Sequence, residues 1–107
     1  MMMEKVASAK DELKIDPLQL KKAALIFRAV NHKLRQQIIK FINQNGKITV
    51  TQIYVKLRLE QSVASQHLAI LRKAGFVTTE RDGKFIYYSV NHDRLSEIHK
   101  VAFELLK

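Results

Sequence analysis

The sequence predicts a mainly α-helical protein with one small β-hairpin. Through most of the chain, apolar residues recur every three or four positions, which is the spacing of one helix face. The period changes between residues 76 and 90, where strand-forming residues flank an Asp-Gly pair. With 107 residues, 47% of them hydrophobic, the chain can bury one small core. We therefore expect a single domain over residues 1–107.

The net charge of +9 is concentrated in the middle of the chain. No acidic residue lies between Pro17 and Leu59. That span instead carries Lys21, Lys22, Arg28, Lys33, Arg35, Lys40, Lys47, Lys56 and Arg58. A positive stretch of this kind suits nucleic acid, because Lys and Arg neutralise phosphates. A solvated basic surface that only aids solubility is the alternative interpretation.

Several classes of protein are excluded by what the sequence lacks. It has no cysteine, so disulfides and thiolate metal sites cannot form. No long apolar run follows Met1–Lys5, and no segment has the length to span a bilayer, so we expect no signal peptide and no membrane partner. A cytoplasmic protein fits these features. No glycine-rich phosphate loop or placeable Ser/His/acid set is present, so we expect no enzyme.

Two helices are predicted in the first half of the chain. Asp16-Pro17 supplies a side-chain cap followed by proline in the first turn, which predicts a helix over residues 17–30. Asn31 is the expected cap of a second helix, which the Asn45-Gly46 turn ends. A further helix could precede these over residues 1–15, where Val6, Leu13 and Ile15 are apolar.

A helix-turn-helix is predicted over residues 49–75. Thr49 or Thr51 can cap a short third helix, and a fourth helix follows over residues 60–74, ended by Gly75. Only a tight turn fits between the two helices, which is the connection of a helix-turn-helix. In such a motif the second helix is the one that recognises DNA.

The fourth helix is expected to have two opposed faces. Ala64, Leu68 and Leu71 share an apolar face that would point into the core. The other face is small and polar at its start and basic at its end, with Ser62, Ser65, Gln66, Ala69, Arg72 and Lys73. Such a helix fits a DNA major groove, where Ser and Gln reach base edges and Arg72 holds a phosphate.

A β-hairpin is predicted over residues 76–90, where two runs of strand formers are joined by Asp82-Gly83. Its tip carries Arg81 and Lys84, which would lie along the DNA backbone or enter the minor groove. A helix-turn-helix followed by a basic-tipped hairpin is a winged helix. The alternative is an ordinary hairpin that packs under the helices. The two interpretations are compatible if the base of the hairpin packs against the core while its tip stays free. The residues expected to face the core are Ile86, Tyr88 and Val90.

The last predicted helix covers residues 92–106 and is capped by Asn91. Leu95, Ile98, Ala102 and Leu105 repeat along it at the three-four spacing of a helix seam. So wide an apolar face must fold onto the body or pair with a second copy, and we favour a homodimer through this helix and residues 17–30. A two-fold dimer would place two recognition helices about one DNA turn apart, on a pseudo-palindromic operator.

In this order, the motifs resemble the ArsR/SmtB family of bacterial winged-helix repressors. The resemblance runs from about Leu25 to Leu106 and includes an Arg-x-x-Ile signature within Leu34–Ile39. Three further segments carry it: Ser62-x-x-Ser65-x-His67-Leu68-x-x-Leu71-x-x-Ala74-Gly75-Phe76-Val77, Arg81-Asp82-Gly83-Lys84, and Tyr87-Tyr88-Ser89-Val90. The resemblance implies a homodimeric repressor that releases operator DNA when an effector binds, and it names no effector.

By position, the resemblance implies that the recognition helix contacts DNA through Gln61, Ser62, Ser65, Gln66 and His67. It also implies that Arg81 and Lys84 of the wing meet the DNA backbone. For His67 a packed, hydrogen-bonded histidine is the alternative, since it lies at the edge of the apolar face.

The chain departs from the family at its metal sites, and we expect no cofactor. Where many members carry Cys-x-Cys, this sequence has Thr49-Val50-Thr51, and hydroxyls are poor ligands for soft metals. Another site of the family uses Asp, His and Glu on the last helix, where the candidates here are His92, Asp93 and His99, near Glu97. A solvated helix face is the alternative interpretation of these residues.

A winged helix can also serve as a protein–protein or RNA-binding adaptor, which is the alternative function. The Ser/Gln face and the acid-free middle of the chain favour DNA over an adaptor. The two functions differ in the salt dependence of DNA affinity, which is steep only where several phosphates are contacted.

Overall fold

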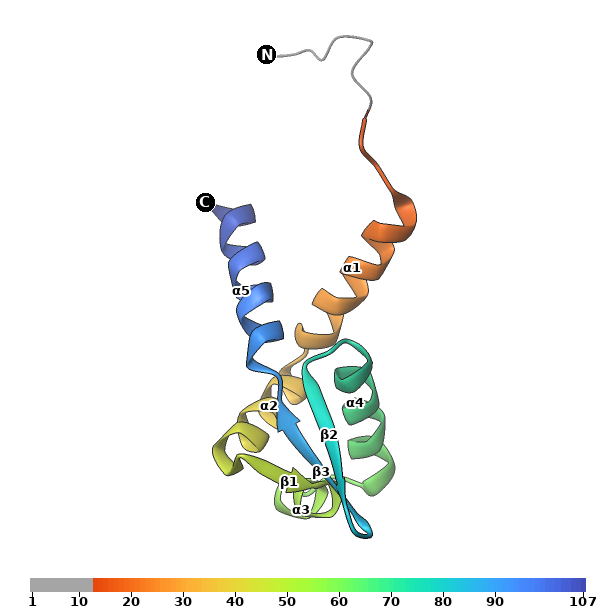
Figure 1. The fold of residues 1–107 in the computed structure, drawn as a ribbon, viewed down its shortest axis with the longest axis vertical. Coiled ribbons are helices and arrows are strands. Elements are labelled where there is room, and N and C mark those ends of the chain that lie inside the picture. Colours follow the sequence, from red (N-terminus) through yellow and green to blue (C-terminus); the bar gives the residue numbers. More distant parts are fainter. Residues whose placement is uncertain (1–12) are drawn as a thin grey trace.

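The structure is a computed structural model that describes residues 13–107. Five helices and a three-stranded antiparallel sheet make up this part of the chain and form a winged helix-turn-helix (Figure 1), as predicted. In chain order the elements are α1 (Pro17–Val30), α2 (Lys33–Asn45), β1 (Lys47–Thr49), α3 (Val50–Lys56), α4 (Gln61–Lys73), β2 (Val77–Asp82), β3 (Phe85–Val90) and α5 (His92–Leu106).

Three helices begin at capping residues that the sequence predicts. Asp16 caps α1 through Oδ1, which accepts from the backbone N–H of Leu18 at 3.1 Å. Of the two threonines considered for α3, Thr49 is the cap, in a reciprocal capping box with Gln52. Asn91 caps α5 by accepting from the backbone N–H of Arg94 at 3.4 Å.

The prediction that Asn31 caps α2 is wrong. Asn31 instead ends α1, with its backbone N–H donating to the carbonyl of Phe27 at 2.9 Å. The cap of α2 is His32, whose Nδ1 accepts from the backbone N–H of Arg35 at 3.3 Å. The possible helix over residues 1–15 falls almost wholly outside the described residues, and residues 13–16 lie in no helix.

The sheet contains a strand that the sequence did not predict. β1 pairs antiparallel with β3, with Ile48 opposite Tyr88, so the strand order is β1-β3-β2. At three residues, β1 is too short to show an alternating pattern. Its middle side chain, Ile48, is nevertheless buried and joins the strand to the core.

The core lies between α2, α3, α4 and the inner end of the hairpin. Its fully buried side chains are Phe76, Ile38, Ile42, Ile53, Leu68, Leu71 and Val77. Tyr88 and Val90 pack against this core as expected. Ile86 does not, because it sits opposite Arg81 in the outer half of the hairpin, beyond the reach of the helices, and it is 42% exposed.

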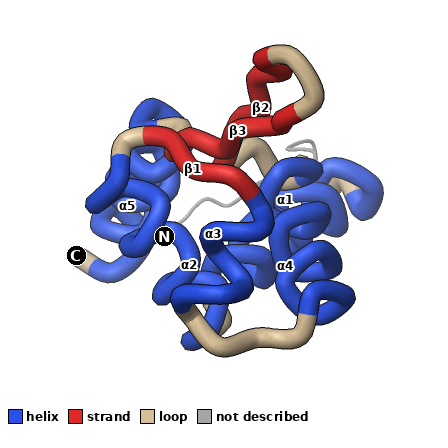
Figure 2. The backbone as a smooth tube through the Cα atoms, turned by 90° about the horizontal axis from the view of Figure 1, so that it is seen from below, coloured by secondary structure: helices blue, strands red, loops and turns tan. Residues whose placement is uncertain are grey.

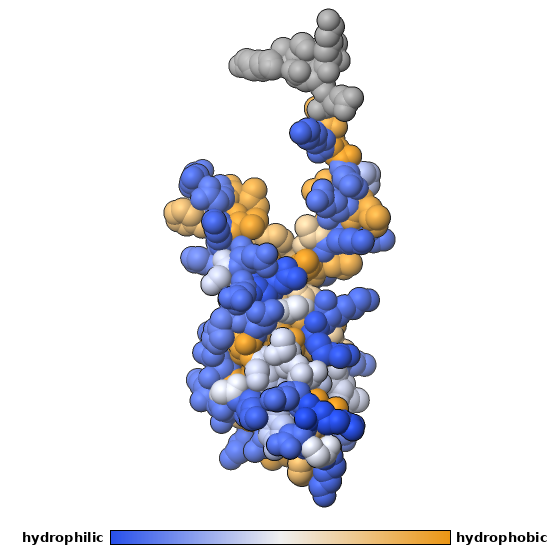
Figure 3. All heavy atoms as spheres, viewed as in Figure 1, coloured by the Kyte–Doolittle hydropathy of each residue, from blue (hydrophilic) through white to orange (hydrophobic). Residues whose placement is uncertain are grey.

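The two terminal helices rise from the same end of the body, opposite the hairpin tip (Figure 1), and Figure 2 shows that tip standing clear of the helices. Hydrophobic atoms gather over the far ends of these helices (Figure 3). The exposed apolar side chains along the two helices are Leu18, Leu20, Leu25, Val101, Phe103, Leu105 and Leu106. Among the helices of the described residues, none has the length and apolar content that crossing a membrane requires.

Candidate nucleic-acid interface

The turn between α3 and α4 fixes the angle at which α4 leaves the body. Arg58 has a positive φ of 56°, and the backbone N–H of Leu59 donates to the carbonyl of Tyr54 at 2.9 Å. The first turn of α4 then forms, with the N–H of Ala64 donating to the carbonyl of Glu60 at 3.0 Å. Glycine ends the helix, since Gly75 adopts a φ of 85° that suits a residue without Cβ.

The side of α4 turned toward the core carries Ala64, Leu68 and Leu71, each with 0% exposure, as predicted. This burial fixes the rotation of the helix and so determines which residues face solvent. Apart from Ile70, the exposed residues are small, polar or basic: Gln61, Ser62, Ser65, Gln66, Ala69, Arg72 and Lys73. Within residues 13–107, the side chains of these residues form no hydrogen bond with one another or with the body. Their donors and acceptors are therefore free to meet a polar surface.

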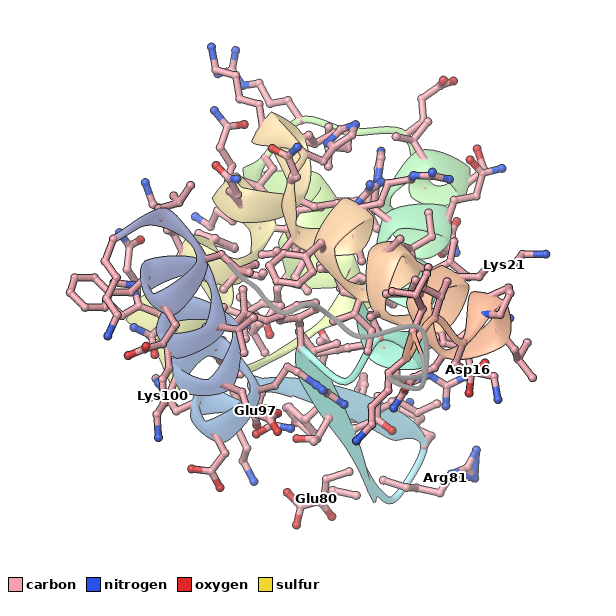
Figure 4. The ribbon with its side chains drawn as sticks, turned by 90° about the horizontal axis from the view of Figure 1, so that it is seen from above. Asp16, Lys21, Glu80, Arg81, Glu97 and Lys100 are labelled. Carbon is pink, nitrogen blue, oxygen red and sulfur yellow. The ribbon has the colours of Figure 1, made fainter. Side chains whose placement is uncertain are left out.

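The hairpin supplies a second basic edge. Its two-residue turn is Gly83-Lys84, one residue later than the predicted Asp82-Gly83 turn, because Asp82 still pairs with Phe85. Gly83 has a φ of 64°, and both Arg81 and Lys84 are exposed. Figure 4 shows Arg81 and Glu80 projecting from the hairpin. Glu80 lies 3.5 Å from the ammonium of Lys47 in an exposed ion pair, so its charge is directed toward β1. At the tip, the charges of Arg81 and Lys84 are therefore available to bind a polyanion.

His67 occupies a different place from the other predicted DNA-contacting residues. It is partly buried, and its Nδ1 lies 3.2 Å from Nη1 of Arg35 on α2. Its ring also lies 5.0 Å, centroid to centroid, from the ring of His32. The sequence allowed two roles for His67, contact with DNA or packing with a hydrogen bond. The contact with Arg35 corresponds to the second.

Arg35 is the residue of this region whose role sequence reasoning missed. It is only 7% exposed, and its Nε donates to the carbonyl of Ala29 at 2.6 Å. Its Nη2 donates to the carbonyl of Arg28 at 3.1 Å. A single guanidinium thus satisfies two carbonyls at the end of α1 and also reaches His67 on α4. The available signal was the Arg-x-x-Ile signature, which marks the position without revealing its contacts.

The surroundings of His67 favour the neutral form of its imidazole. Partial burial lowers the pKa of His67, and the nearby Arg35 and His32 lower it further. A neutral ring has one nitrogen without a proton, and Nδ1 in that form accepts from the guanidinium of Arg35. The neutral form is therefore the one that fits this contact.

The metal candidates on the last helix are not brought together into a site. His92, Asp93 and His99 are exposed residues of α5. In the part of the chain from residue 13 onward, no three His, Asp or Glu side chains are placed to hold a metal ion. Thr49, at one of the positions where the family carries cysteine, is occupied in capping α3.

An exposed polar and basic face on the second helix of a helix-turn-helix, beside a basic hairpin tip, defines a winged-helix DNA-binding protein. Residues 32–79 match the model of a family described as "Bacterial regulatory protein, arsR family". Individual relatives extend the similarity over most of the chain. The chain belongs to this family of DNA-binding transcriptional regulators and is not an enzyme.

Two relatives illustrate the similarity. An uncharacterized HTH-type transcriptional regulator, MJ1325 of Methanocaldococcus jannaschii, is 39% identical over 84 residues, covering 78% of this chain and 94% of the relative. The transcriptional repressor PagR of Bacillus anthracis is 33% identical over 88 residues, covering 82% and 88%. The crystal structure of PagR aligns with a TM-score of 0.64 at 31% identity, covering 81% of this chain and 99% of that one.

A third similar structure is that of the homodimeric winged helix-turn-helix domain of Mb0332 from Mycobacterium bovis, described as a possible ArsR-family transcriptional regulator. It aligns with a TM-score of 0.70 at 25% identity, covering 91% of this chain and 93% of that one. The aligned share includes most of the described residues.

Proposed function

We propose that this protein is a homodimeric transcriptional repressor, a single domain over residues 1–107, that binds a pseudo-palindromic operator in the cytoplasm. The two copies pair through α1 and α5, each α4 enters a major groove, and each wing follows the backbone. The observation that carries the proposal is the placement of two kinds of surface. Unpartnered apolar faces gather at one end of the described chain, and the free polar face of α4 lies on the body below them.

The apolar faces support pairing of two copies. Phe103 is 62% exposed, Leu105 73% and Leu106 85%, all within the last turns of one helix. Each of these side chains that a partner buries fully would stabilise the association by about 1.5–3 kcal/mol. A second copy covers the faces on both helices at once and gives a two-fold particle. The homodimeric Mb0332 domain supports the pairing of two copies by similarity.

The repressor role has a steric basis. A protein seated in two successive major grooves occupies DNA that polymerase must reach, so binding near a promoter blocks transcription. The similarity to PagR, which is named as a repressor, supports this direction of regulation. Base reading falls to Gln61, Ser62, Ser65 and Gln66, and phosphate contacts to Arg72, Arg81 and Lys84.

The first test is fluorescence anisotropy with duplex DNA from upstream of the protein's own gene, against a scrambled duplex, across a salt series. We expect sequence-selective binding whose affinity falls steeply with salt. Weak binding that ignores sequence would contradict the proposal and favour the adaptor or RNA-binding alternative.

Two further measurements address the finer parts of the proposal. Sedimentation equilibrium at micromolar concentration should give a dimer, and a monomer there would contradict the pairing of α1 and α5. A reporter gene behind the bound sequence should fall in expression when the protein is present. A rise in expression would identify an activator instead.

A further inference from the structure

A groove of about 380 Å³ runs between α1 and the C-terminal end of α4. Its walls are apolar and come from Leu25, Ile26 and Ala29 on α1 and from Ile70 and Ala74 at the end of α4. This volume falls in the range of roughly 300–1,000 Å³ that is typical of small-molecule sites. The groove thus has the size and lining of a site for an apolar ligand.

Two ammonium groups complete the lining, Lys22 on the α1 wall and Lys73 on the α4 wall. No acidic residue lines the groove, and neither α1 nor α4 contains one anywhere along its length. Among the described residues, the lysines that form salt bridges are Lys47 and Lys107, and not the two in the groove. Apolar walls bearing two positive charges match a molecule with an apolar body and a single anionic group.

We propose that this groove binds an amphipathic carboxylate, either a medium-chain fatty acid or an aryl carboxylate, and that its occupancy lowers the affinity for DNA. The apolar body lies against Leu25, Ile26 and Ile70, and the carboxylate sits between Lys22 and Lys73. The effect on DNA rests on the function proposed above, whereas binding of the carboxylate does not.

A second copy of the chain is the competing occupant, because Leu25 and Ile70 are 50% and 41% exposed. The α1 of a second copy contains no acidic residue, and Glu97 and Glu104 of its α5 already pair with Arg94 and Lys107. Either α1 or the apolar C-terminal half of α5, laid over the groove, would therefore bury Lys22 and Lys73 without a free carboxylate of its own to pair them, and burying unpaired charge is costly. A carboxylate satisfies the same lysines. The charges therefore favour an anion over an apolar helix.

The position of the groove gives a ligand access to the recognition helix. Arg35 holds the end of α1 by donating hydrogen bonds to the carbonyls of Arg28 and Ala29, and it also contacts His67 on α4. A ligand wedged between α1 and α4 acts on both sides of this connection. Such a ligand changes DNA affinity when the spacing it prefers differs from the spacing in the DNA complex.

Calorimetry of the whole protein with decanoate, kept below its micelle concentration, tests the binding site. The test variant is Lys22→Gln with Lys73→Gln, and the matched control is Lys21→Gln with Lys40→Gln, which removes the same charge from residues outside the groove. Lys21 points away from the body in Figure 4. We expect saturable binding by the wild type and the control, and affinity weaker by about tenfold or more in the test variant.

Decyltrimethylammonium, which has an alkyl chain of similar length and the opposite charge, should bind at least about tenfold more weakly than decanoate. Equal affinity of decanoate for all variants, or equal affinity of the two amphiphiles, would overturn the proposal. Ala74→Leu fills the groove and should weaken decanoate binding while leaving sedimentation unchanged. If it instead shifts the monomer–dimer equilibrium and spares decanoate binding, the groove belongs to the interface between copies and the proposal fails.

The second part of the proposal, that the ligand lowers DNA affinity, is tested by fluorescence anisotropy. The measurement compares the affinity for the operator duplex with and without decanoate. We expect decanoate to weaken DNA binding by the wild type about tenfold and by Lys22→Gln/Lys73→Gln less than about twofold. If decanoate binds but DNA affinity is unchanged, the proposed effect on DNA binding is wrong, while the ligand site stands. A protein that binds no DNA would contradict the proposed function, while calorimetry would still decide the site.

Discussion

Arg35 on α2 and His67 on α4 are joined side chain to side chain, with Nη1 3.2 Å from Nδ1. The same guanidinium holds the last carbonyls of α1, so one buried arginine ties three helices together. The connection runs from a terminal helix with an open apolar face to the helix that carries the residues proposed to contact DNA. Perturbing it should therefore affect both the stability of the fold and the placement of α4.

Arg35→Lys should destabilise the protein although it keeps the charge. A lysine presents a point charge in place of a planar fork and cannot reach the carbonyls of Arg28 and Ala29 together with His67. Losing buried hydrogen bonds to a charged group costs about 1.5–3 kcal/mol. Urea unfolding measures this change, and Arg81→Lys on the exposed hairpin is the matched control. Equal stability of the two variants would show that the fork geometry of Arg35 does not matter.

His67→Gln should change how stability depends on pH. The pKa of His67 in the folded chain is lowered from 6.5, the value expected when unfolded. Between these two pKa values the unfolded state binds more protons, so this histidine costs stability as pH falls through about 6.5 and costs nothing well above it. The free energy of unfolding of the wild type relative to His67→Gln should therefore decline as pH falls from about 7.5 to about 5.

The matched control for that pH series is His99→Gln, which removes an exposed histidine on α5. Comparing the two variants by urea unfolding at each pH isolates the contribution of the site beside Arg35. A wild type that gains stability relative to His67→Gln on acidification would reverse the sign and contradict the neutral, accepting imidazole.

The wing prediction concerns Arg81→Ala with Lys84→Ala. Both side chains are exposed at the hairpin tip, and as phosphate ligands they carry no sequence information. The double variant should weaken binding to operator and scrambled DNA alike. The slope of log affinity against log salt should fall by roughly 0.9 for each phosphate that is no longer neutralised. Lys100→Ala with Lys107→Ala on α5 and its end is the control, and an unchanged slope in the wing variant would remove the wing from the interface.

Much of this fold was predictable because its signals are local. The alternation of buried Ala64, Leu68 and Leu71 with exposed neighbours oriented α4. The Asp82-Gly83 pair located the hairpin, although the two-residue turn itself is Gly83-Lys84, because Asp82 still pairs with Phe85. β1 was missed because three residues show no period, and it becomes a strand only by pairing with β3.

The less predictable features depend on segments that are distant in sequence. Arg35 is buried only because the end of α1 and the ring of His67 close over it. The groove brings Lys22 and Lys73 to opposite walls from helices separated by three other elements. No pattern within either helix indicates such a pairing, whereas the exposed face of α4 could be identified from its own spacing.

The base-reading prediction concerns Ser65→Ala with Gln66→Ala. These side chains lie on the exposed face of α4 and can hydrogen-bond base edges. Removing them should weaken operator binding by about 1–3 kcal/mol for each base that is no longer read, and leave scrambled DNA unaffected. Ser96→Ala on α5 is the control. Competition anisotropy measures both affinities, and an equal weakening for the two duplexes would contradict base reading by this pair.

The pairing prediction uses α5. Phe103→Glu with Leu105→Glu places carboxylates on side chains that are 62% and 73% exposed in one chain, so the fold of each copy should survive. In a dimer those positions face a second apolar helix, and burying unpaired charge there disrupts association. Sedimentation should show a monomer with an unchanged circular dichroism spectrum, while Glu97→Gln with Lys100→Gln stays dimeric.

Loss of pairing also has a consequence for DNA. A dimer binds its two half-sites in one event, so the second α4 meets its groove at a high effective concentration. Separated copies lose that advantage, and affinity for the full operator should fall by about a hundredfold or more while affinity for an isolated half-site stays the same. Anisotropy with both duplexes decides the point. A monomeric variant that still binds the full operator tightly would show that α1 and α5 do not align the two recognition helices.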